Sequence, residues 1–128
     1  MQIFKEIKQS THEKVVYFHD PDTNLKSIIA IHSTIMGPSL GGCRMMPYLN
    51  QEEALIDVLR LSEGMTYKAA IAGLNLGGGK AVILADPKTD KTENLLKSFG
   101  HFVDRLSGDY ITAEDMGMKV RDMEVIKR

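Results

Sequence analysis

Apolar residues recur along the chain with two spacings, one typical of strands and one typical of helices. Runs rich in β-branched and aromatic residues at 14–19 and 25–32 flank the polar turn residues 20–24, which predicts a β-hairpin. From 51 to 67 the apolar positions follow a helical period, and the same period returns at 89–106. We therefore expect strands and helices to be mixed within one domain.

Glycine and proline are concentrated in a few segments between these elements. Segment 36–48 is dense in both, which predicts a shaped loop around a short strand near 43–45. The alternation of elements after residue 43, together with the early hairpin, indicates an α/β fold with a mixed sheet flanked by helices. The remaining expected elements are a short helix over 2–9, a glycine-rich break at 73–79, a buried strand at 80–85, a short strand at 110–113 and a last helix from 119 onward.

Composition narrows the possible partners. The chain has 128 residues, with 16 Lys and Arg against 17 Asp and Glu, and its net charge is -1. The overall charge therefore does not indicate binding to nucleic acid or to an anionic membrane. No apolar run approaches a membrane span, and the charged start of the chain does not read as a signal peptide. Cys43 is the single cysteine, so we expect it to be buried and inert in a reducing, cytoplasmic compartment. The four histidines are scattered without ligand spacing, and no metal is assigned.

Two lysines and one carboxylate stand at the borders of predicted elements. Lys68 ends one glycine-containing segment, and Lys80 opens an apolar strand directly after three glycines. The spacing fits neither a P-loop nor a dinucleotide fingerprint, so no nucleotide site is expected in this chain. Asp115 follows a predicted strand, where it would either serve an active site or cap the next helix, and these readings are equally supported.

Four segments, taken together and in this order, resemble the glutamate, leucine, phenylalanine and valine dehydrogenase superfamily, with the leucine dehydrogenases as the closest fit. They are GPSLGGCRM at 37–45, GMTYK at 64–68, GLNLGGGK at 73–80 and YITAEDMG at 110–117. The resemblance implies NAD-dependent, reversible oxidative deamination of L-leucine and related branched-chain amino acids to 2-oxo acids and ammonia. It also implies that residues 1–128 are the N-terminal substrate-binding, catalytic and oligomerisation domain of a homo-oligomer. A C-terminal Rossmann domain that binds NAD is then absent from this sequence.

The resemblance also implies roles for individual residues. Lys80 matches the catalytic lysine, and Asp115 matches the group that relays protons during the reaction. Lys68 matches the lysine that binds the substrate carboxylate, a task suited to a fixed ammonium. The side-chain pocket would be lined by Leu40, Gly41, where glycine leaves room for a branched substrate, and Met65. The chain departs from the family pattern at 118–119, where Met and Lys replace hydroxyl-bearing residues, which puts hydrogen bonding around the neighbouring carboxylate in doubt.

Two other functions fit the same composition. The hairpin and helices could belong to a non-catalytic oligomerisation module in which the glycines only shape turns. A small-anion-binding module could instead use Lys68 and Lys80. The three hypotheses differ in whether both lysines and Asp115 converge on one place, because an assembly module has no need to focus them there.

Overall fold

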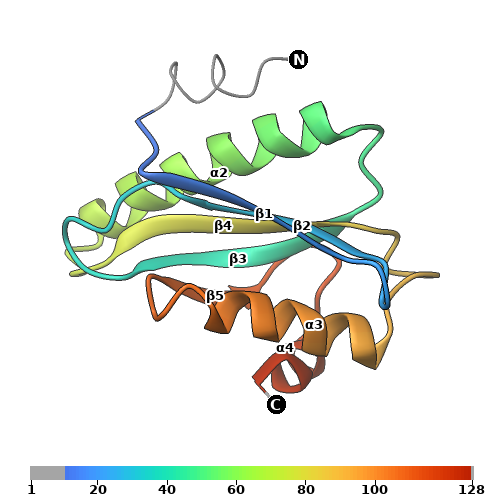
Figure 1. Ribbon diagram of the computed structural model, residues 1–128. Helices are drawn as coiled ribbons and strands as arrows, with labels where there is room; N and C mark the ends of the chain where they lie inside the picture. The colour runs from blue at the N-terminus through green and yellow to red at the C-terminus, as the bar shows by residue number, and fades with distance from the viewer. Residues whose placement is uncertain (1–10, 128) are drawn as a thin grey trace.

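A mixed five-stranded sheet lies between helices on its two faces (Figure 1). The computed structural model describes residues 11–127, and the predicted helix over 2–9 lies outside these. The strand order is β1-β2-β4-β3-β5, antiparallel from β1 to β4 and parallel from β4 to β5, so the predicted mixed sheet is confirmed. The elements are β1 Lys14–Asp20, β2 Leu25–Ile31, β3 Ser39–Met46, α2 Gln51–Ile71, β4 Gly77–Leu84, α3 Glu93–Asp104, β5 Tyr110–Glu114 and α4 Val120–Lys127.

The hairpin of β1 and β2 forms as predicted, with Asp20 paired to Leu25 at its turn. One carboxylate holds the turn: Oδ1 of Asp20 accepts from the backbone N–H of Asp22 at 3.0 Å, and Oδ2 accepts from the hydroxyl of Thr23 at 3.0 Å. Asn24 adopts the left-handed conformation with φ of 60°, which asparagine tolerates better than most residues. The polar turn residues therefore act through identifiable hydrogen bonds.

Helix α2 connects two parallel neighbours, β3 and β4, and packs across one face of the sheet (Figure 1). Asn50 caps its start, because the side-chain oxygen accepts from the backbone N–H of Glu53 at 2.9 Å. Gly73 follows its end with φ of 73°, a conformation that favours glycine. Four buried apolar residues of α2 pack on Ile28, Ala30 and Val82 of β2 and β4; these four are Ala54, Leu55, Val58 and Leu59.

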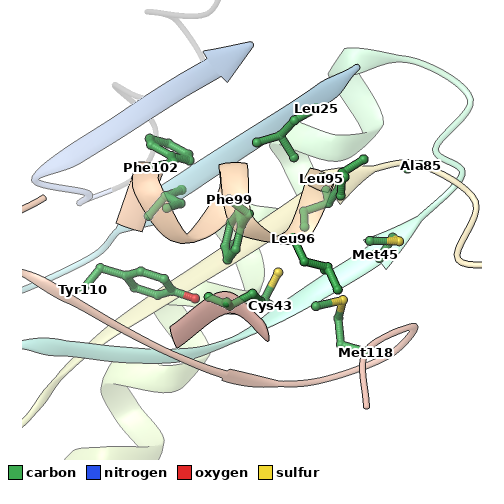
Figure 2. Packing of buried hydrophobic residues seen from close by; sticks show 14 of the residues in the cluster. Leu25, Cys43, Met45, Ala85, Leu95, Leu96, Phe99, Phe102, Tyr110 and Met118 are labelled. Atoms are coloured by element: carbon green, nitrogen blue, oxygen red, sulfur yellow. The ribbon is translucent and has the colours of Figure 1, made fainter. Parts of the chain in front are cut away.

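Helices α3 and α4 cover the opposite face, where the larger part of the core lies (Figure 2). Phe99 and Phe102 of α3 are almost completely buried, and Thr92 caps this helix by accepting from the backbone N–H of Leu95 at 3.1 Å. Cys43 of β3 lies in the same cluster with none of its surface exposed, as predicted. Burial raises the pKa of the Cys43 thiol, which disfavours the reactive thiolate.

The glycine-rich segments differ from the prediction. The expected short strand at 43–45 is an eight-residue strand, β3, and the glycines before Lys80 belong to β4 itself. Close packing explains this, since a Cβ on Gly77 would lie 1.7 Å from the carbonyl oxygen of Ser33, and one on Gly78 would lie 2.2 Å from the backbone nitrogen of Thr66. These glycines therefore admit neighbouring backbone to an extended strand.

Candidate active site

Lys80 and Asp115 form an ion pair, with 2.7 Å between Nζ of Lys80 and Oδ2 of Asp115. Lys80 lies on central strand β4 with only 8% of its side chain exposed, and Asp115 directly follows β5 with 25% exposed. On β4, Ala81 packs into the α3 side of the core and Val82 into the α2 side. Because strand side chains alternate, Lys80 points to the α2 side, and the pair lies there. A buried ammonium needs such a partner.

Gly42 of β3 lies between the two paired groups. It is the residue of β3 that pairs with Ala113 of β5. A Cβ on Gly42 would lie 2.8 Å from the Cβ of Asp115 and 3.4 Å from Nζ of Lys80. The missing side chain therefore makes the space in which lysine and carboxylate meet.

The ion pair extends into a network that the sequence analysis missed. Nε of Arg44 donates to Oδ2 of Asp115 at 3.0 Å, so this one oxygen faces two cations. The Nη1 atom of the same guanidinium lies 3.4 Å from Oδ2 of Asp57 on α2. The hydroxyl of Tyr48 also donates to Oδ2 of Asp57, at 2.5 Å. Arg44 of β3 thus connects helix α2 with the residue that follows β5.

The network favours an ionised Asp115. Burial alone would raise its pKa, but hydrogen bonds from Lys80, the backbone of Met116 and Arg44 outweigh burial and hold the pKa of Asp115 below its ordinary value. Tyr48 is affected in the opposite sense: burial, and then its bond to the carboxylate of Asp57, raise the pKa of the Tyr48 hydroxyl, which therefore remains a donor. The carboxylate of Asp115 binds Lys80, Arg44 and the backbone of Met116, and the next helix, α4, begins only at Val120, so Asp115 does not cap that helix.

Lys68 lies near the end of α2 and is exposed. Within residues 11–127 it forms no ion pair. Lys68, Gly64 and Asp57 are separated by nearly whole helical turns, so they share one side of α2, the side on which Asp57 meets Arg44 of β3. A Cβ on Gly64 would meet nothing within 4 Å, so this side of the helix borders open space. Lys68 is therefore a free cation on the flank of α2 that faces β3.

Leu40 and Met65 are both half-buried, and Leu40 shares its face of β3 with Gly42. Next to Leu40, Ile111 of β5 leaves 43% of its surface exposed on the same face, so this part of the sheet is not fully covered by α2. Gly41 differs from its prediction, because a Cβ there would lie 1.5 Å from the carbonyl oxygen of Gly79. Close approach of β4 accounts for this glycine, rather than room for a substrate side chain.

The described part of the chain contains no cluster of three or more His, Cys, Asp and Glu residues suited to a metal ion. Over the same residues, no helix is both long enough and apolar enough to cross a membrane.

Comparison with known proteins assigns the fold to the N-terminal domains of amino acid dehydrogenases. The family model described as the Glu/Leu/Phe/Val dehydrogenase dimerisation domain matches residues 12–128, and the chain belongs to this family. It is 54% identical over 126 residues to a leucine dehydrogenase of Geobacillus stearothermophilus, covering 98% of this chain and 34% of that protein. It is 58% identical over 115 residues to a phenylalanine dehydrogenase of Bacillus thermotolerans, covering 90% of this chain and 30% of that protein.

A solved structure gives the same result for the fold. The crystal structure of L-tryptophan dehydrogenase from Nostoc punctiforme has a TM-score of 0.94 and 47% sequence identity, covering 98% of this chain and 37% of that chain. The chain thus spans about a third of the length of the relatives that it matches. The expected α/β fold of the amino acid dehydrogenase type is confirmed.

Proposed function

We propose that this chain is the N-terminal substrate-binding and catalytic domain of an NAD-dependent amino acid dehydrogenase that acts on L-leucine and related branched-chain amino acids. The observation that carries the proposal is the Lys80–Asp115 pair, which is largely buried at the border of an uncovered part of the sheet. A lysine and a carboxylate in contact are suited to moving protons, which oxidative deamination requires. The leucine dehydrogenase relative supports leucine as the substrate.

Each residue has a task in this proposal. Lys80 accepts a proton from the substrate amine or from the attacking water, and Asp115 passes protons at the carbinolamine and imine stages. Lys68, the free cation on the flank of α2, holds the substrate carboxylate. Leu40 and Met65 contact the aliphatic side chain, while Gly41 shapes the backbone below them through its close approach to β4.

NAD has to be held elsewhere. The glycines before Lys80 are packed in β4 against Ser33 and Thr66, so their backbone cannot cradle a pyrophosphate. When bound, NAD would accept the hydride from the substrate. We assign its binding to a C-terminal Rossmann domain that this sequence does not include.

Assembly and compartment complete the proposal. The matched family domain is described as a dimerisation domain, which supports a homo-oligomer. The buried free thiol of Cys43 suits the reducing cytoplasm. The proposed partners are the amino acid substrate and further copies of the chain, without nucleic acid or membrane.

The ion pair also separates this proposal from the alternative of a small-anion-binding module. With the carboxylate of Asp115 2.7 Å from Nζ of Lys80, an incoming anion would meet a negative charge beside that cation. A non-catalytic oligomerisation module would have no use for a charged cluster of this kind on an uncovered part of the sheet.

The test is an assay of the full-length protein that contains residues 1–128. We expect L-leucine to reduce NAD, with L-valine and L-isoleucine accepted, and L-phenylalanine and L-tryptophan turned over less efficiently. Preference for an aromatic substrate would overturn the specificity but not the reaction class. Absence of NAD reduction with every amino acid would overturn the whole proposal, and turnover by residues 1–128 alone would overturn the domain assignment.

A further inference from the structure

Arg44 is the second cation at the same oxygen of Asp115. The distances to Oδ2 are 2.7 Å from Nζ of Lys80 and 3.0 Å from Nε of Arg44. Only 17% of the Arg44 side chain is exposed, so water screens this contact less than it would a surface ion pair. The carboxylate is therefore neutralised from two sides, by one lysine and one arginine.

The two cations differ in whether they can lose a proton. If Lys80 serves as the base, its Nζ must first release a proton to water before it can accept one from the substrate amine or from the attacking water. A guanidinium does not release its proton in proteins. During the interval in which Lys80 is neutral, Arg44 is thus the charge that remains beside Asp115.

We propose that Arg44 is a positioning residue that acts as the permanent counter-charge of Asp115, so that Lys80 can give up its proton while Asp115 stays ionised. This inference rests on the proposed function. Without Arg44, the carboxylate would attract the proton of Lys80 more strongly, because it would have no other cation. It would also lose the contact that fixes its orientation when Lys80 is neutral.

Asp57 holds the guanidinium in place from the opposite end. Its Oδ2 lies 3.4 Å from Nη1 of Arg44 and accepts from the hydroxyl of Tyr48, while its Oδ1 lies 2.9 Å from Nη2 of Arg60. Arg60 is 69% exposed and reaches Asp57 from the solvent side. Arg60 therefore shares a carboxylate with Arg44 without contacting Asp115, which makes it a matched control.

The experiment measures kcat and KM for leucine as a function of pH in the full-length protein and its variants. For Arg44→Gln we expect the acidic limb of kcat/KM to move upward by about one pH unit, the scale of one nearby charge in a partly buried site. Near neutral pH this lowers kcat/KM about tenfold, and activity recovers at higher pH. Arg44→Lys keeps a cation and should restore most of the shift. Arg60→Gln should leave the limb in place.

The outcomes are distinct. A structural role alone would lower activity equally at all pH values, so an unmoved limb in Arg44→Gln overturns the inference while an active parent leaves the proposed function standing. If Arg44→Gln does not fold, Arg44→Met fills similar volume and gives the same test. A parent protein without NAD reduction overturns the proposed function and this inference together.

Discussion

The Cα of Gly42 faces the side chain of Asp115 so closely that a Cβ on the glycine would lie 2.8 Å from the Cβ of the aspartate. Two carbon atoms that are not bonded to each other cannot lie this close, so one of them would have to move. The ion pair between Asp115 and Lys80 therefore depends on a residue that contributes no side chain of its own.

Gly42→Ala should displace Asp115 and lengthen its contact with Lys80. We expect kcat/KM of the full-length enzyme to fall by about 10²-fold, because a shift of roughly 1 Å in a catalytic group can have an effect of that size. Steady-state kinetics would measure it. Gly64→Ala is the matched stability control: its Cβ meets nothing within 4 Å, and it should raise the free energy of unfolding by about 0.5–1 kcal/mol. Unaltered kinetics in Gly42→Ala would contradict the role of this space.

Substitution of the two lysines should separate binding from proton transfer. Lys68→Ala removes an attraction that is present in the ground state and the transition state alike, so it should mainly raise KM for leucine. Lys80→Ala removes the proposed base, so kcat should fall by about 10²–10⁴-fold. Near-parental kcat for Lys80→Ala at saturating leucine would rule out its role as general base.

His12 should make stability depend on pH in the weakly acidic range. Burial, and then the neighbouring charge of His32, lower the pKa of His12, so the unfolded chain binds a proton more readily than the folded one. Its contribution is therefore complete above the unfolded pKa of about 6.5 and is lost as pH falls toward the lower folded value. Urea unfolding between neutral pH and about pH 5 should show a smaller loss for His12→Gln than for the parent. If the free energy of unfolding fell equally with pH in the parent and in His12→Gln, this prediction would be wrong.

Asp122 should stabilise the fold over most of the pH range. Although burial opposes ionisation, bonds from Lys91 at 2.7 Å and from the backbone N–H of Lys119 at 2.8 Å hold the pKa of Asp122 below its ordinary value. Its contribution is present above the unfolded pKa of about 3.9 and is lost as pH falls through the folded value. Asp122→Asn should lower the free energy of unfolding by about 1–3 kcal/mol at neutral pH. The difference from the parent should disappear in acid, which denaturation at several pH values would check.

Much of the fold followed from local patterns. The hairpin at 14–31 and the helices α2 and α3 carry strong periodicity or turn chemistry, and they form near the predicted residues. The glycine-rich stretches were misjudged, because glycine reads as a loop residue in sequence. In β4 it is required by the close approach of backbone from Ser33 and from Thr66 of α2, contacts of the folded chain that a local sequence pattern does not reveal.

The candidate site, like the fold, could be predicted from the sequence only in part. Lys80 was identifiable because a lysine that opens an apolar strand after glycines is unusual. Asp115 was undecided between site and cap until the pairing of β3 with β5 brought it to Lys80. Arg44 lies in the segment 37–45 that carries the family resemblance, but the sequence assigned it no role, since its two carboxylate partners come from α2 and from the residue after β5.

Strand β3 lies between β4 and β5, so the order of the sheet has a consequence for folding. Lys80 becomes enclosed when β2, β3, α2 and β4 come together, but its counter-ion arrives only with β5 (Figure 1). In a folding intermediate without β5, the ammonium of Lys80 would be partly buried without a counter-ion. The backbone N–H and C=O groups along the edge of β3 would also lack partners. Docking of β5 removes both defects at once. The charge pair proposed for chemistry would thus also couple the last strand to the rest of the sheet, which favours cooperative, all-or-none unfolding of this domain.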